Sequence, residues 1–283
     1  MANNVGKGII FLIGQDCSSY HFKDLKYASS NEDLQGIYSS IQGITGTGLF
    51  VIGGFDQVAS LLSHSDLTLA HLVDVNLTAV EYARLRLALT QISDTRFEYV
   101  RRLISRRVTG DFEDILSLKR YIDSKDKRFD HELAEETATL LRSNFGISEK
   151  LLEETILTQR FEWGLSRGNE GDFIADRRLW SFLEINEDNW LSSDVYFEKV
   201  KTMYQNGKIK FSHFDLANST VSLNLFGNLS LIYLSNIHDW LKVELNHLIS
   251  HLCLNGLETD ENTIIISTST KEEGRGKITT RNL

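Results

Sequence analysis

The sequence predicts an α/β protein whose core is a parallel β-sheet with helices packed against it. Short, continuously apolar runs such as residues 49–52 are typical of strands that are buried on both faces. These runs alternate with longer helical segments, which is the order of a βαβ protein. A glycine pair after one strand and an aspartate after the next are typical of a doubly wound, Rossmann-like sheet.

The first strand is expected over residues 49–52, after a helix over residues 32–42 and a turn that is rich in glycine. Gly53 and Gly54 stop this strand, because glycine is unfavourable inside regular structure. A short helix over residues 57–64 then leads the chain to the next strand. Strand, glycine turn and helix in this order form the first half of a βαβ unit.

The second strand is expected over residues 70–73 and ends at Asp74. Thr78 is of a type that caps helices, and apolar residues recur on one side of the segment that follows it. The chain from about residue 106 to residue 207 is charge-rich and mostly helical in pattern. We therefore expect a helical insertion or cap between the second and third strands of the sheet.

Strands return near the C-terminus. Residues 208–214 alternate in polarity and lead to Asp215, whereas residues 229–234 are apolar and lead to Ser235 and Asn236. The last two expected strands, which can pair as a hairpin, are residues 263–267 and 277–281. These elements make one domain, with its core at about residues 27–105 and 208–283 and its helical insertion at about residues 106–207.

The composition excludes several classes of function. A net charge of −9 argues against a nucleic-acid surface, because phosphate binding depends on clustered lysine and arginine. Cys17 and Cys253 form no disulfide framework, and no zinc-ligand spacing is present. The apolar runs are too short to span a bilayer, and the N-terminus does not resemble a signal peptide. We expect a cytoplasmic protein that binds a small molecule without a metal, nucleic acid or membrane, in an oligomeric state that the sequence leaves open.

The chain of 283 residues contains no proline. At the usual frequency of roughly 5%, about 14 prolines are expected. Proline is useful at the first position of helices and in turns, so folding gives no reason to exclude it. Either the protein is made when proline is scarce, or it is made in a cell that contains a proline mimic, which is inserted at proline codons. A compositional accident is the simpler alternative.

Polar residues or glycines follow the expected strands where each strand ends, which is where ligands bind in open α/β sheets. Glycine at this point lets a ligand approach the backbone closely, and an acid roughly 20 residues later accepts hydrogen bonds from ribose hydroxyls. Gly53 and Asp74 have this spacing. The turn lacks the three glycines of a pyrophosphate-binding loop, which favours S-adenosylmethionine over a dinucleotide. The expected ligand-binding residues are Gly53, Gly54, Phe55, Asp56, Asp74, Val75, Asn76, Asp215, Leu216 and Ser235. The acids among them are also explained as simple caps at strand ends.

Several stretches carry a resemblance to a known family: YASSNEDL at 27–34, VIGG at 51–54, VDVN at 73–76 and LSNIHDWL at 234–241. In these motifs and in the long helical insertion, the chain resembles the S-adenosylmethionine-dependent 3-amino-3-carboxypropyl transferases, which include the betaine-lipid-forming transferases. The resemblance implies the class I methyltransferase fold and displacement at Cγ of the aminocarboxypropyl arm, with release of methylthioadenosine. Leu77 stands where the family usually has proline, and the divergent insertion leaves the acceptor open.

The catalytic residues that the resemblance implies are Ser235, Asn236, Tyr27, Asn31 and Glu32. Ser235 and Asn236 are expected beside the reacting arm, and the N-terminal motif is expected to close over it. A simpler reading of that motif is the start of a helix, with a cap and acids in its first turn. Tyr233 either stabilises the sulfonium by a cation–π contact or belongs to the core, as its apolar strand suggests.

The cofactor carries a nucleophile of its own, the α-amino nitrogen. Its attack on Cγ closes a four-membered ring and gives azetidine-2-carboxylate, a proline analogue that is one methylene smaller. Discrimination against a missing methylene is worth only about 1–3 kcal/mol, so this product enters proteins at proline codons. The leading hypothesis is therefore an azetidine-2-carboxylate synthase, which benefits from having no proline. The alternatives are intermolecular transfer to a small metabolite or lipid headgroup, a small-molecule methyltransferase, and a cofactor-binding module without turnover.

Overall fold

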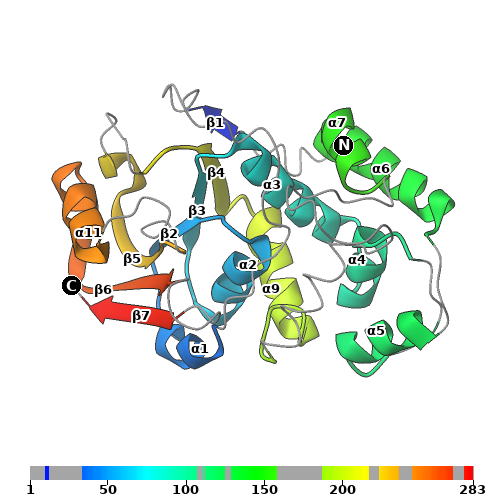
Figure 1. Ribbon diagram of the computed structural model, residues 1–283, viewed down its shortest axis with the longest axis horizontal. Helices are drawn as coiled ribbons and strands as arrows, with labels where there is room; N and C mark the ends of the chain where they lie inside the picture. Colours follow the sequence, from blue (N-terminus) through cyan, green and yellow to red (C-terminus); the bar gives the residue numbers. More distant parts are fainter. Residues whose placement is uncertain are drawn as a thin grey trace.

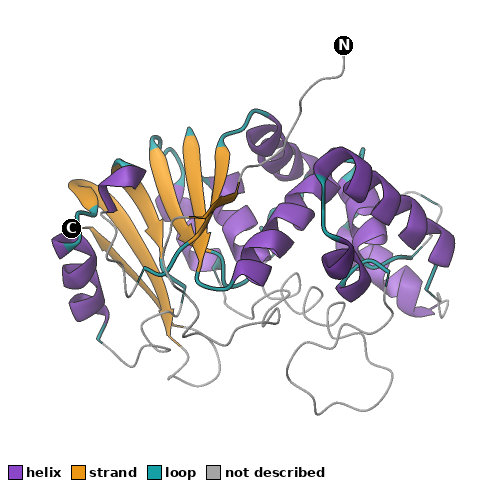
Figure 2. Cartoon of the chain, turned by 90° about the horizontal axis from the view of Figure 1, so that it is seen from above, coloured by secondary structure: helices purple, strands orange, loops and turns teal. Residues whose placement is uncertain are grey.

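The fold is described from a computed structural model of the chain. It describes residues 10–12, 34–106, 110, 112–124, 129–157, 187–216, 223–235, 244–269 and 277–282. The sheet occupies one end of the molecule and a group of helices the other (Figure 1). The view from above shows helices on both faces of the sheet, with most of them on one side (Figure 2).

The sheet has seven strands in the order β1-β4-β3-β2-β5-β6-β7. Its strands are β1 Ile10–Leu12, β2 Thr47–Val51, β3 Leu69–Asp74, β4 Ile209–His213, β5 Asn228–Tyr233, β6 Glu258–Ser269 and β7 Lys277–Asn282. All neighbours are parallel except β6 and β7, which pair antiparallel as the expected hairpin. Counted from β2, the five central strands have the order 3-2-1-4-5 of Rossmann-like folds, which confirms the predicted α/β class.

The helices follow the predicted order along the chain. They are α1 Gln35–Ile41, α2 Phe55–His64, α3 Leu77–Gln91, α4 Arg96–Leu103, α5 Ile115–Ser124, α6 His131–Phe145, α7 Glu149–Glu154, α9 Asp194–Gln205, η2 Leu223–Phe226 and α11 Leu245–Leu254. The helices from α3 to α9 lie between β3 and β4, which the sequence predicted as its second and third strands. Helices α5 to α9 fall within the predicted insertion at residues 106–207, whereas α3 and α4 belong to the part predicted as core. Helix α2 begins two residues earlier than expected, directly after Gly54, so Phe55 and Asp56 belong to its first turn.

Side-chain caps set the starts of several helices. The cap of α3 is Asn76, whose side chain accepts a hydrogen bond from the Thr78 N–H at 3.0 Å. The prediction of Thr78 as the cap is therefore wrong, because Thr78 already lies in the first turn. Asp130 caps α6 and Ser193 caps α9 in the same way. Gly146 ends α6 with a left-handed φ of 62°, a conformation that glycine adopts without strain.

The core lies on both faces of the sheet. Consecutive residues of β2 point to opposite sides, with Phe50 in one hydrophobic cluster and Leu49 in the other. Helices α1, α2 and α3 pack on the Phe50 side, whereas η2 and α11 pack on the Leu49 side. Burial on both faces explains why the strands appear as continuous apolar runs in the sequence. Tyr233 is fully buried in the first cluster, which agrees with its interpretation as a core residue.

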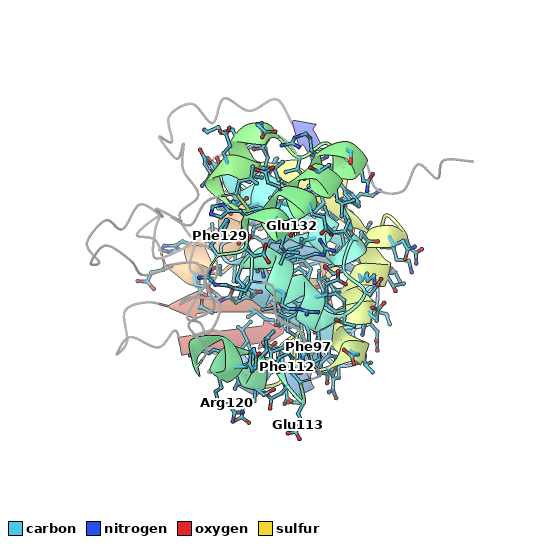
Figure 3. All side chains as sticks on the ribbon, turned by 90° about the vertical axis from the view of Figure 1, so that its right-hand side faces the viewer. Phe97, Phe112, Glu113, Arg120, Phe129 and Glu132 are labelled. Carbon is cyan, nitrogen blue, oxygen red and sulfur yellow. The ribbon has the colours of Figure 1, made fainter. Side chains whose placement is uncertain are left out.

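The insertion is built around aromatic contacts. The rings of Phe97 in α4 and Phe112 lie next to one another, with centroids 6.1 Å apart (Figure 3). Tyr121 of α5 meets Phe112 edge to face at 5.6 Å. Helix α9 returns to the sheet and packs on α2 and α3, so this part of the expected cap is a helix of the sheet layer. Among the helices that the structure describes, none has the length and apolar character needed to cross a membrane.

Candidate functional site

The carboxyl ends of the parallel strands meet at one edge of the sheet. The strand order reverses between β2 and β5, because the chain runs from β2 through β3 to β4 on one side and from β5 to β6 on the other. Such a switch point opens a crevice for ligands in α/β proteins. The parallel register brings the residues after β2, β3, β4 and β5 to this edge. Gly53, Asp74, Asp215 and Ser235 follow or end these strands, as the sequence predicted.

Gly53 joins the ends of three strands. Its φ of 43° lies in the left-handed region, and its N–H donates to Asp74 Oδ2 at 3.2 Å. A Cβ at this position would lie 3.0 Å from the Ser235 Oγ, which is closer than most side chains tolerate. Ser235 is itself in the left-handed region, with a φ of 50°, which is uncommon for a residue with a side chain. Non-glycine residues in this conformation often occur at functional sites.

Asp74 is held in place by backbone donors. Besides the Gly53 bond, its Oδ1 accepts from the Asn76 N–H at 2.8 Å. Burial raises the pKa of Asp74 to about 6, although the hydrogen bonds from Asn76 and Gly53 and the nearby His213 lower it. A carboxylate fixed beside a glycine turn at the switch point is suited to accept hydrogen bonds from a ribose diol. Val75 and Asn76 lie directly beyond it, with the Asn76 side chain committed to the α3 cap.

Sequence reasoning did not single out His213, which ends β4 and is the register partner of Asp74. Its Nε2 lies 2.8 Å from the Val75 carbonyl oxygen. A carbonyl only accepts, so Nε2 carries a proton and donates it to this carbonyl oxygen. The available signal was a polar residue at the end of an expected strand, two positions before Asp215.

Asp215 and Leu216 lie at the same edge. The N–H of Phe214, the residue before Asp215, donates to the Asp74 carbonyl oxygen at 2.9 Å, which joins the end of β4 to the end of β3. Asp215 is only 6% exposed, and Leu216 packs with Phe214 in the second hydrophobic cluster. Asp215 therefore directly follows the residue that joins β4 to Asp74, whereas Leu216 belongs to the hydrophobic core beside this edge.

The end of β6 adds hydroxyl groups that the sequence did not mark as part of the site. The Ser235 carbonyl oxygen accepts hydrogen bonds from the Thr268 N–H and from the Ser267 Oγ, both at 3.0 Å. These bonds hold Ser235 in its left-handed conformation across from Gly53. The signal in the sequence was the change from isoleucines to serine and threonine at the end of the expected strand.

Phe55 and Asp56 do not face this edge. The Asp56 carboxylate is fully buried, where it pairs with Arg86 at 2.7 Å and accepts from the Trp190 Nε1–H at 3.0 Å. The Phe55 ring meets Trp190 edge to face at 5.7 Å, and the Arg86 guanidinium lies 5.0 Å from its centroid. Both side chains point into the core, because α2 begins at Phe55 and its first turn directs them toward Arg86 of α3 and Trp190. We therefore leave Phe55 and Asp56 out of the candidate site.

The remaining predicted residues cannot be placed. Tyr27, Asn31, Glu32 and Asn236 lie outside the residues that the structure describes. The site that can be described consists of Gly53, Gly54, Asp74, Val75, Asn76, His213, Asp215 and Ser235, with Leu216, Ser267 and Thr268 supporting it.

Comparison with protein families gave one match that covers most of the chain. The model of a family described as a domain of unknown function (DUF7790) matches residues 27–281. The matched region runs from the first stretch that carries the transferase resemblance into β7, so it includes the whole sheet from β2 onward. A search of curated proteins found no match. The chemistry must therefore be argued from the site.

Proposed function

Since the chain belongs to the DUF7790 family, a domain of unknown function, we propose its activity from the candidate site: an S-adenosylmethionine-dependent enzyme that acts at Cγ of the aminocarboxypropyl arm. The reaction we favour is intramolecular cyclisation to azetidine-2-carboxylate with release of methylthioadenosine. The fold that goes with this proposal is the class I methyltransferase variant of the Rossmann-like sheet. The ligand is a small molecule, and no metal has a part in the reaction.

One observation carries the adenosine part of the proposal. At the switch point, the Gly53 N–H donates to the Asp74 carboxylate, and a Cβ on Gly53 would lie only 3.0 Å from the Ser235 Oγ. This arrangement combines close backbone approach with a fixed acceptor for ribose hydroxyls. The turn lacks the further glycines that a pyrophosphate needs, which favours a nucleoside ligand over a dinucleotide.

The proposed reaction balances without a second substrate. The ammonium group of the arm first loses one proton, and the neutral nitrogen then attacks Cγ from the side opposite the sulfur. The N–C bond forms as the C–S bond breaks, and the sulfur keeps the electron pair and leaves as the neutral thioether methylthioadenosine. The ring nitrogen keeps its positive charge as azetidinium, so one proton is released per turnover. The protein must orient the arm for in-line attack and exclude water.

The absence of proline supports cyclisation over transfer. The product is a proline analogue, and an enzyme without proline codons is protected from its incorporation. The second candidate, transfer of the arm to a small metabolite, rests on the motifs alone, which resemble transferases with separate acceptors. A lipid acceptor is less favoured, because a net charge of −9 repels anionic membrane surfaces.

The test is incubation of the purified protein with S-adenosylmethionine alone, followed by mass spectrometry of the products. The proposal expects methylthioadenosine and azetidine-2-carboxylate in equal amounts without an added acceptor. Methylthioadenosine that forms only with an added acceptor indicates intermolecular transfer. S-adenosylhomocysteine indicates a methyltransferase, and an intact cofactor with every acceptor argues against an enzyme of this class.

A further inference from the structure

Gln57 is a buried residue to which neither the proposed reaction nor the sequence motifs assign a role. It lies in the first turn of α2, three residues after Gly54, and its side chain is fully buried. Within the part of the chain that the structure describes, neither its Nε2 nor its Oε1 has a hydrogen-bond partner. A buried amide without partners is costly, and in native proteins it usually indicates a missing ligand, water or ion.

Asp56 and Ser60, the polar residues of α2 nearest to Gln57, are satisfied within the protein. The Asp56 carboxylate binds Arg86 and Trp190. The Ser60 hydroxyl donates to the Asp56 carbonyl oxygen at 2.8 Å and accepts from the Trp190 N–H at 3.2 Å. The polar groups of Asp56 and Ser60 that meet Arg86 and Trp190 are thus paired. Gln57 lies about 100° around the helix from Asp56, and neither atom of its amide joins this network.

The geometry of the helix directs Gln57 toward the switch point. Gln57 shares a face with Leu61 and His64, which follow it at helical spacing. The His64 ring lies between Tyr38 of α1, with centroids 4.0 Å apart, and Tyr196 of α9, with centroids 4.4 Å apart. Helical side chains tilt toward the N-terminus of their helix, so we expect the amide to be directed back over the first turn, toward Gly53 and Gly54. No side chain among the described residues caps this N-terminus. Its backbone N–H groups therefore face the same region as the amide.

An uncapped helix N-terminus favours an anion, because its free N–H groups and the helix dipole both attract negative charge. The amide of Gln57 offers two N–H donors and one carbonyl acceptor. A group with a carboxylate and an ammonium on one carbon satisfies all of these at once. We propose that Gln57 and the first turn of α2 bind the α-amino acid group of the ligand, with the carboxylate on the N–H groups and the ammonium on Oε1.

This assignment rests on the proposed function and adds a role for one residue to it. In S-adenosylmethionine the α-amino acid group ends the arm that reacts, so Gln57 would orient the nitrogen that attacks Cγ. Both amide atoms are closed to solvent, which suits a displacement that water must not intercept. A ligand reaches the amide only if the surrounding side chains give way on binding.

The experiment compares three ligands on three proteins by calorimetric titration. The ligands are S-adenosylmethionine, methylthioadenosine, which lacks the α-amino acid group, and free methionine. The proteins are the wild type, Gln57→Met, which keeps the shape of the side chain without its amide, and Gln205→Met. Gln205 is exposed at the end of α9, before β4 begins and so at the opposite edge of the sheet, which makes it a matched control.

The proposal expects Gln57→Met to weaken S-adenosylmethionine binding about 10- to 100-fold, as befits hydrogen bonds to charged groups, and methylthioadenosine binding less than about 2-fold. Gln205→Met should change neither affinity. The melting temperature of Gln57→Met without ligand should equal or exceed that of the wild type, because two unpaired buried polar atoms are removed. The assignment would be overturned if Gln57→Met lost affinity equally for both nucleosides or kept its affinity for both. A clear drop in its melting temperature would also overturn the assignment.

The methionine titration separates this assignment from the proposed function. The wild type could bind methionine but neither nucleoside, and Gln57→Met could lose the binding of methionine. In that case the nucleoside proposal fails, while Gln57 still binds an amino acid. If Gln57→Met loses methionine binding but keeps S-adenosylmethionine binding, the assignment to the arm of S-adenosylmethionine is overturned, and Gln57 binds a separate amino acid substrate instead. Failure of the wild type to bind all three ligands overturns both proposals.

Discussion

Replacing Asp74 by asparagine should stabilise the ligand-free protein at neutral pH while it removes ligand binding. Burial raises the pKa of Asp74 from 3.8 to about 6. At neutral pH the folded protein therefore holds this carboxylate in its charged form, which lowers the free energy of unfolding. At roughly 1.4 kcal/mol per pKa unit, the shift corresponds to about 3 kcal/mol at pH 7.5. Because Asp74 keeps part of its surface exposed, solvent screening makes this figure an upper limit.

The asparagine also loses an interaction. Its amide nitrogen cannot accept, so one of the two backbone donors, Gly53 or Asn76, is left without its partner. A lost hydrogen bond of this kind costs about 1 kcal/mol. The net expectation for Asp74→Asn is a gain of about 1–2 kcal/mol in the free energy of unfolding at pH 7.5.

The sign of the effect should reverse at low pH. A group whose pKa is raised by folding contributes its full stability below its unfolded pKa and loses it as the pH rises through its folded pKa. The free energy of unfolding of the wild type should therefore rise relative to that of Asp74→Asn as the pH falls from about 6 to below 4. Below pH 4, the variant should be the less stable of the two by about 1 kcal/mol.

Urea unfolding between pH 4 and pH 8 measures this crossover. The matched control is Asp66→Asn, an exposed carboxylate paired with Lys199 at 2.9 Å, which should change the stability by less than about 0.5 kcal/mol at any pH. Loss of more than about 1 kcal/mol by Asp74→Asn at pH 7.5, without a crossover, would refute the reasoning. It would show that the backbone hydrogen bonds outweigh the burial of the charge.

Other variants test the packing around the site through urea unfolding and thermal melting. Asp56→Asn leaves the buried Arg86 without its counter-ion and should lower the free energy of unfolding by about 3–5 kcal/mol; a loss below 1 kcal/mol would contradict a buried ion pair. Gly53→Ala forces a Cβ to 3.0 Å from the Ser235 Oγ at a positive φ and should cost about 1–3 kcal/mol; an unchanged melting temperature would mean that the turn relaxes freely. Ser235→Gly relieves the left-handed conformation and should stabilise the fold by up to about 1 kcal/mol, whereas a marked loss would show that the hydroxyl matters more.

The sheet could be predicted because its strands are buried on both faces. Continuous apolar runs in β2 and β5, and the spacing between Gly53 and Asp74, are local properties that the sequence displays directly. Strand β1, which lies in the apolar run of residues 9–13, was not predicted as a strand. The order of the central strands then follows from the rules for doubly wound sheets.

The side chains of α2 could not be assigned from the sequence. An acid in the first turn of a helix usually faces solvent, where the helix dipole favours it. Asp56 instead meets Arg86 and Trp190, which lie 30 and 134 residues away in the chain, so no local pattern contains the network. Likewise, the unpaired amide of Gln57 is a property of its surroundings. His213 was missed because its partner Val75 directly follows β3, 138 residues earlier in the chain.

The insertion between β3 and β4 also affects how the chain folds. Gly53 and Asp74 bond across 21 residues, whereas His213 and Val75 bond across 138, so β4 can complete the sheet only after the whole insertion has been synthesised. Loop-closure entropy grows only with the logarithm of loop length, so the longer closure costs about 1.7 kcal/mol more than the shorter one. Such a modest thermodynamic penalty leaves the length of the insertion free to vary. The folding rate is affected more strongly, because contacts between residues that are distant in the sequence slow folding. The edge of β3 also stays unpaired until β4 joins the sheet.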